Sequence, residues 1–213
     1  MTTEGADDEP MTEPDRQVCL RGRTVALSPL DADDADLLHT WRSRPGEVEI
    51  IAWPAPGGAA ADPLPALLGA YHLSTEAEKG RPVADVRALP DRYRREITHP
   101  ERAFAADTVL LALTGDRAAG CLILTAATDG RSELKRLWAA PETRGQGVGA
   151  ALVRTALDRA AATGAHTLAL SVWQWRTPAI ALYERLGFAA VPSWEERDGL
   201  LCMERHVGRR AVT

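Results

Sequence analysis

Three glycines at alternating positions, Gly145, Gly147 and Gly149, stand just ahead of an alanine-rich helical pattern in the stretch APETRGQGVGAALV. Glycines permit a turn whose backbone N–H groups point outward at the start of a helix, and such a turn binds phosphate. Arg144 adds a fixed positive charge beside it. We therefore predict that the loop holds the two phosphates of a pyrophosphate, because a tight turn alone would need one glycine rather than three.

The glycines fit two nucleotide motifs that predict different enzymes. One is the dinucleotide fingerprint G-x-G-x-x-A, ending at Ala150, and the other is R-x-x-G-x-G, beginning at Arg144. A dinucleotide turn follows the first strand of a parallel sheet, whereas three consecutive strand patterns precede this loop. The next strand, 167–173, also ends without the acid that would hold a ribose. A P-loop fits less well still, because no Lys-Ser/Thr pair follows the glycines, so we favour the second motif.

Alternating and helical periodicities predict the elements that position this loop. Their order is β-α-α-β-β-β-α-β-α-β-β. The predicted strands cover 24–30, 109–113, 121–125, 132–140, 167–173, 188–194 and 200–207, and the predicted helices cover 31–43, 83–97, 148–163 and 177–187, with Pro90 breaking or delaying the second helix.

The ends of the chain and one internal segment differ in composition from the rest. Residues 1–16 carry six acids and one arginine, and this difference of five equals the net charge of -5. We predict a disordered acidic leader there, one folded domain over 17–207, and a short tail over 208–213. The segment from about 45 to 82 is rich in Pro and Gly without clear periodicity, which predicts an extended lid that carries acceptor specificity.

Composition also limits the class of protein. The body is electrically neutral without a basic stripe, which argues against a nucleic-acid partner, and no apolar run is long enough for a membrane span. The first residues lack the features of a secretory signal, so we expect a cytoplasmic protein. Three cysteines and five histidines are scattered, which predicts buried thiols and no metal site. The dominance of Arg over Lys and the abundance of Ala are typical of a GC-rich bacterial genome.

The stretch from SELKRLWAAPETRGQGVGAALV through TPAIALYERLGF resembles the GCN5-related N-acetyltransferase (GNAT) superfamily. A strand, the R-x-x-G-x-G turn, a helix, a strand and then A-x-x-L-Y-x-x-x-G-F match in order and spacing over about 132–188. The strand order upstream extends the resemblance to about 23–207. It implies one α/β (α+β) domain, in which about four helices flank a twisted, mostly antiparallel sheet of about seven strands with splayed central strands.

The resemblance also implies acetyl-CoA as co-substrate. A strand edge left unpaired between 134–139 and 167–173 would accept the amide-rich pantetheine arm, and a backbone N–H near Trp138 or Ala139 would stabilise an oxyanion. Arg176 stands where many family members carry Asn or Gln in contact with the cofactor. The expected cofactor-binding residues are Leu137, Trp138, Ala139, Arg144, Gly145, Gln146, Gly147, Val148, Gly149, Ala150 and Arg176.

Two residues are the catalytic candidates. Tyr183 matches the family tyrosine that often protonates the departing thiolate, although its helical spacing is equally that of a core residue. Glu133, at the head of the strand before the loop, is the leading general base, with a solvated surface role as the alternative. Candidate walls of the acceptor pocket are Trp53, Trp173 and Trp175.

These residues predict transfer of an acetyl group to the amine of a small molecule by direct attack in a ternary complex. Two alternatives stay open: acetylation of a protein amino terminus or lysine, and a non-catalytic acyl-CoA sensor. We expect a monomer or a homodimer.

Overall fold

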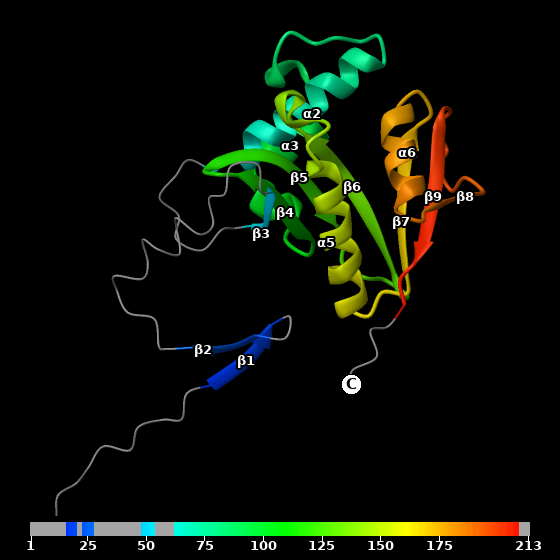
Figure 1. Cartoon of the computed structure of the whole chain (residues 1–213). Coiled ribbons are helices and arrows are strands. Elements are labelled where there is room, and N and C mark those ends of the chain that lie inside the picture. Colours follow the sequence, from blue (N-terminus) through cyan, green and yellow to red (C-terminus); the bar gives the residue numbers. More distant parts are fainter. Residues whose placement is uncertain (1–15, 21–22, 28–47, 54–61, 209–213) are drawn as a thin grey trace, which may run out of the picture. The chain divides into compact units, whose positions relative to one another are not determined.

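The computed structural model describes residues 16–20, 23–27, 48–53 and 62–208 (Figure 1). The chain divides into two units, 1–42 and 43–213. In the first unit, β1 (Arg16–Leu20) and β2 (Arg23–Leu27) pair as an antiparallel hairpin. The described part of the strand expected at 24–30, up to Leu27, therefore pairs within this hairpin and not in the seven-stranded sheet. The leader predicted over 1–16 and the helix predicted over 31–43 lie almost wholly outside the described residues.

The second unit is built on a seven-stranded sheet in the order β3-β4-β5-β6-β7-β9-β8. All neighbours are antiparallel except β6 and β7, which are parallel, so the predicted mostly antiparallel sheet is confirmed. The strands are β3 (Val48–Trp53), β4 (Thr108–Thr114), β5 (Arg117–Leu124), β6 (Arg131–Ala139), β7 (Thr167–Trp173), β8 (Ala189–Val191) and β9 (Leu200–His206).

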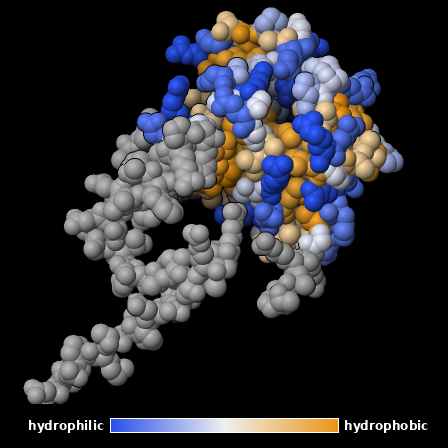
Figure 2. Space-filling view, viewed as in Figure 1, coloured by the Kyte–Doolittle hydropathy of each residue, from blue (hydrophilic) through white to orange (hydrophobic). Residues whose placement is uncertain are grey.

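Helices cover both faces of this sheet. Alternate strand residues face opposite sides, so Leu110 packs in a core with α5 and α6, whereas Leu111 packs in a second core with α2 and α3. The helices are α2 (Leu64–Glu78), the short 3-10 turn Val86–Ala88, α3 (Asp91–Thr98), α4 (Pro100–Ala103), the 3-10 turn Pro141–Thr143, α5 (Val148–Ala162) and α6 (Thr177–Arg185). In Figure 2 the region where Figure 1 places α5 shows hydrophobic residues among hydrophilic ones, as expected for an alanine-rich helix with few charges.

The segment 45–82, predicted to be an extended lid without clear periodicity, forms regular elements in the parts that the structure describes, and its role in acceptor specificity stays a prediction. Val48–Trp53 forms the edge strand β3, and Leu64–Glu78 forms the 15-residue helix α2. Apolar and small residues lie on several faces of α2 itself, so its sequence does not divide clearly into an apolar and a polar face. For that reason the sequence shows no clear helical periodicity here, although Leu64, Leu67 and Leu68 are all buried in the structure.

The predicted helix over 83–97 is broken before Pro90, as its sequence suggested. A short 3-10 turn at Val86–Ala88 precedes it, and α3 begins at Asp91. Of the three cysteines, Cys121 and Cys202 are buried free thiols, as expected. None of the described helices is both long enough and apolar enough to cross a membrane.

Candidate active site

A slot opens where the two parallel strands at the centre of the sheet separate. Strands β6 and β7 pair only from Arg131 to Leu134 on the β6 side, and beyond Leu134 they diverge (Figure 1). A bulge in β6 shifts its register against β5, and Arg136 at the bulge has a φ of 54°. A cavity of about 390 Å³ lies between the separated strands. The prediction of splayed central strands is confirmed.

The β6 backbone beyond the bulge has one free edge. Ala140 donates its N–H to the carbonyl of Ala119 over 2.8 Å, toward β5. Backbone groups alternate in direction along a strand, so those of Leu137 and Ala139 point away from β5, toward the side that β7 has left. Arg144 Nε reaches the Ala139 carbonyl there, at 3.4 Å. This edge can accept an amide-containing ligand as an added strand.

The three glycines of the loop serve two different purposes. Gly145 and Gly147 have φ of 78° and 87°, in the left-handed region that favours glycine, and Gly147 is the N-cap of α5. Gly149 lies against α6: a Cβ added there would sit 3.3 Å from Leu182 Cδ2. The inference from the number of glycines is therefore wrong, because turn geometry and helix packing account for all three without a phosphate.

The start of α5 has the features of an anion site. The first helical bond runs from the Ala151 N–H to the Gly147 carbonyl, and no side chain caps the helix. The N–H groups of Val148, Gly149 and Ala150 precede that bond and have no acceptor within the helix. The positive end of the helix dipole and these donors together suit a phosphate.

Side chains beside this helix start add charge and support. Arg144 and Gln146 are exposed, and the Gln146 side chain donates to the Glu142 carbonyl at 3.0 Å, which braces the loop. Arg144 also lies over the Trp138 ring, 5.1 Å from its centroid. Val148, by contrast, is buried, so it contributes its backbone and not its side chain.

Tyr183 belongs to both the core and the cavity. Its side chain is 5% exposed and packs edge-on against Phe188 at 5.7 Å, yet it also lines the cavity between the strands. The two roles weighed from the sequence are therefore compatible. Burial raises the pKa of the Tyr183 phenol above its ordinary value, so the hydroxyl is protonated at neutral pH.

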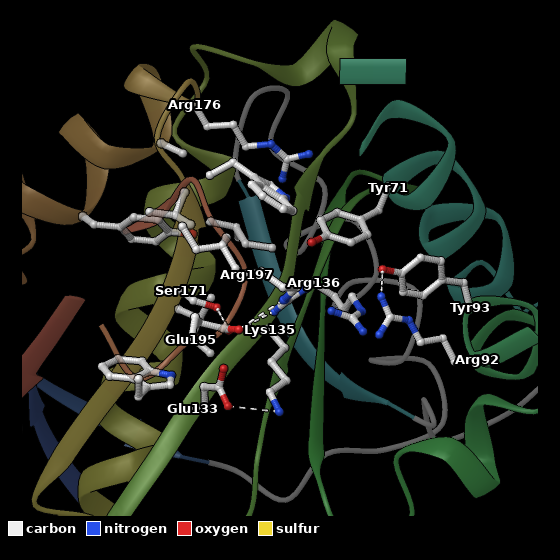
Figure 3. Close-up of a pocket in the computed structure, with 18 residues that line it drawn as sticks. Tyr71, Arg92, Tyr93, Glu133, Lys135, Arg136, Ser171, Arg176, Glu195 and Arg197 are labelled. Atoms are coloured by element: carbon white, nitrogen blue, oxygen red, sulfur yellow. Dashed lines mark hydrogen bonds and ion pairs between the residues drawn. The ribbon is translucent and has the colours of Figure 1, made fainter. Parts of the chain in front are cut away.

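Two carboxylates line the same cavity, and only one was predicted (Figure 3). Glu133 pairs with Lys135, Oε2 to Nζ at 3.0 Å. Glu195 comes from the connection between β8 and β9 and accepts from Ser171 Oγ at 2.7 Å and from Arg197 at 2.7 Å. Burial alone would raise the pKa of Glu195, but the hydrogen bonds from Arg197 and Ser171 outweigh it and lower the pKa.

Arg176 bridges two helices that lie far apart in the sequence. Its Nε lies 2.6 Å from Glu78 Oε2 and its Nη2 donates to Thr75 Oγ1 at 2.7 Å, joining the start of α6 to the last turns of α2. Burial alone would raise the pKa of Glu78, but Arg176 lowers it. The guanidinium is occupied by these partners, so its contact with a cofactor stays a prediction.

The tryptophans predicted as pocket walls separate into two groups. Trp173 and Trp175 stack with ring centroids 4.6 Å apart and line a second cavity of about 450 Å³, and Trp173 also lines the first. Trp53 lines neither cavity. Its indole N–H donates to Asp62 at 2.9 Å, and its ring packs against the core beside α2. Trp138 is 8% exposed and also packs there, edge-on to Tyr71.

Comparison with known proteins identifies the family. The model of the Acetyltransferase (GNAT) family matches residues 71–188, more than half of the chain. The chain belongs to the GNAT acetyltransferase family.

Individual relatives are more distant. A streptothricin acetyltransferase from Streptomyces lavendulae is 36% identical over 89 residues, which are 42% of this chain and 47% of the relative, so the chain spans about half the length of this curated relative. The match to the solved structure of a putative acyl-CoA N-acyltransferase from Klebsiella pneumoniae has a TM-score of 0.56 and 24% identity, and covers 76% of this chain and 99% of that one. The match to a GNAT acetyltransferase from Staphylococcus aureus has a TM-score of 0.58 and 14% identity, and covers 76% of this chain and 100% of that one. These two show the same fold.

In this GNAT chain a partly buried ionic network supports the cavity wall, and sequence reasoning missed it. Glu96 on α3 takes two hydrogen bonds from Arg136 and one from His72 Nε2 at 2.9 Å. Burial alone would raise the pKa of Glu96, but these bonds lower it to about 2. Burial lowers the pKa of His72, outweighing the bond to Glu96. The members of this network come from α2, α3 and β6, so no local spacing in the sequence could have indicated the network.

Proposed function

We propose that the chain transfers an acetyl group from acetyl-CoA to the amine of a small molecule, by direct attack in a ternary complex. The observation that carries the proposal is the cavity between the diverging ends of β6 and β7, with Tyr183 and Glu133 on its walls. A proton donor and a proton acceptor around one cavity are what amide formation from a thioester and an ammonium ion requires.

The residues around the slot fit acetyl-CoA. The uncapped N–H groups of Val148 to Ala150 and the exposed Arg144 suit its pyrophosphate, and the free backbone edge at Leu137 and Ala139 suits its pantetheine amides. When bound, acetyl-CoA supplies an activated acetyl thioester. The Ala139 N–H, on the free edge, would donate to the thioester oxygen and stabilise the charge that develops there.

Tyr183 and Glu133 would divide the proton transfers. The raised pKa of Tyr183 keeps its proton available for the departing thiolate. Glu133 would accept one proton of the acceptor ammonium, directly or through water, once its pairing with Lys135 is exchanged. The second proton, which the nitrogen loses after attack, would restore the Tyr183 phenol. The lowered pKa of Glu195 makes it a poor base, and it suits holding the ammonium as a counter-charge.

Two observations favour direct attack on a small acceptor. Burial raises the pKa of the Cys121 thiol to about 12, so it offers no thiolate to carry the acetyl group, and the Cys202 thiol is buried away from a thioester. Tyr71 on α2 and Tyr93 on α3 wall the cavity, whose volume of about 390 Å³ is that of a small-molecule site. The name of the streptothricin acetyltransferase relative points the same way.

Calorimetric titration with acetyl-CoA, followed by thiol-release assays on an amine panel, tests the proposal. We expect binding and acetyl-CoA turnover that depends on a small amine. No heat of binding would contradict it. Binding without thiol release on small amines or peptides would favour a non-catalytic sensor, and release with peptides alone would favour a protein acceptor.

A further inference from the structure

The second cavity adjoins the first and has an unbalanced charge. The two cavities share Arg92, Trp173 and Arg197 in their walls, so a ligand can extend from one into the other. Lys79, Arg81, Arg92 and Arg197 line the second cavity, and Glu78 is the one acid among its lining residues.

Most of these charges are already paired. Glu78 is bound to Arg176, Lys79 Nζ lies 2.6 Å from Glu76, and Arg197 Nη2 lies 2.7 Å from Glu195. Within the described part of the chain, Arg81 and Arg92 have no acidic partner within ion-pair distance. Two positive charges therefore face this cavity without compensation.

Arg92 is held in place by an aromatic ring. Its Nη2 donates to the Tyr93 hydroxyl at 2.5 Å, and its guanidinium carbon lies 4.5 Å from the centre of the same ring (Figure 3). A guanidinium has five N–H donors in a planar fork, so several remain for a ligand. The stacked rings of Trp173 and Trp175 form an apolar wall of the same cavity.

We propose, on the basis of the proposed function, that the acceptor is an amine whose opposite end carries a carboxylate or a phosphate. The amine lies in the first cavity beside Glu133 and Glu195, and the anionic end lies in the second cavity against Arg81 and Arg92. Carboxylate and phosphate both match the guanidinium fork, which binds either group through paired hydrogen bonds. An acceptor that carries only positive charge is disfavoured at this mouth.

A homologous series of acceptors tests the proposal and measures the distance between the two ends. Thiol release is followed with ω-amino acids of increasing chain length, with their neutral amides, and with aminoalkyl phosphates. At the best chain length, kcat/KM for an acid exceeds that for its amide by about tenfold, the size expected for hydrogen bonds to a charged group. The acids and the phosphates, compared with each other, show which anion is preferred.

Variants connect the preference to the two arginines. Arg92→Gln and Arg81→Gln each lower the ratio of acid to amide turnover, and together they bring it close to one. Arg117→Gln, at an exposed position on β5 that lines neither cavity, leaves the ratio as in the parent. The proposal is overturned if amides match the acids and phosphates, if the ratio survives both substitutions, or if acetyl-CoA binds and no anionic amine is acetylated. Failure of acetyl-CoA to bind would overturn the proposed function instead.

Discussion

Glu96 holds Arg136 at two points, with Nε and Nη2 of the arginine 2.8 and 2.7 Å from the two oxygens of the carboxylate. Arg136 sits at the β6 bulge with a φ of 54°, a conformation that costs a non-glycine residue about 1–2 kcal/mol. The ion pair links α3 to the point where β6 turns away from β7. We infer that Glu96 is a positioning residue that stabilises the bulge and thereby keeps the slot open.

Glu96→Gln removes the charge that holds Arg136. We expect the free energy of unfolding to fall by roughly 2–3 kcal/mol, less than for a fully buried pair because the Arg136 side chain is 24% exposed. Acetyl-CoA affinity should fall as well, because the slot loses its support. Urea unfolding and calorimetric titration measure the two effects.

A second substitution separates loss of the slot from loss of stability alone. Glycine adopts positive φ without strain, so Arg136→Gly in the Glu96→Gln background should restore acetyl-CoA binding toward that of the parent. Unchanged binding in Glu96→Gln alone would contradict the positioning role. Failure of the double variant to recover binding while it remains folded would contradict the link to the bulge.

Acid should destabilise the protein through the same network. The pKa of Glu96 is lowered to about 2 in the folded state, so its contribution is present above the unfolded value near 4.5 and is lost as pH falls toward 2. The pKa of His72 is lowered too, so protonation of the unfolded chain below about 6.5 also favours unfolding. Urea midpoints at intervals from pH 7 to pH 3.5 should decline.

Glu96→Gln again provides the control for this decline. The variant should start lower at pH 7 and lose less stability on acidification, since one of the two titrating groups is absent. A parent midpoint that is flat from pH 7 to pH 3.5, or a variant with the same slope as the parent, would show that Glu96 is not the group responsible.

A double-mutant cycle with Glu78 distinguishes two roles of Arg176, the ion pair that joins α6 to α2 and the predicted contact with acetyl-CoA. If the bridge is its role, Arg176→Gln and Glu78→Gln should each cost less than about 1 kcal/mol of stability, because the pair is partly exposed, and their effects should not add. Acetyl-CoA affinity should then change equally in both variants. A loss of affinity confined to Arg176→Gln would support the cofactor contact that the sequence predicted.

Local signals in the sequence predicted much of the C-terminal half of this fold. The strand, turn and helix around Arg144 and the helix that carries Tyr183 follow from contiguous patterns, because each element has its own periodicity and boundary residues. Helix α2 was not predicted, because small and apolar residues lie on several of its faces and the sequence does not distinguish the buried face from the others. Glu195 and Glu96 escaped as well, since sheet order brings Glu195 to the cavity wall and helix packing brings Glu96 to Arg136, each from a distant part of the chain.

Turnover by Tyr183→Phe tests the central claim most directly. The substitution removes the hydroxyl and leaves the buried ring that packs against Phe188, so the fold should persist. With an amine that the parent acetylates, we expect kcat to fall by about 10²-fold or more, as for loss of a general acid, and the dissociation constant of acetyl-CoA to stay within about twofold. A Phe variant with the parent's kcat would contradict the account of Tyr183 as proton donor in this cavity.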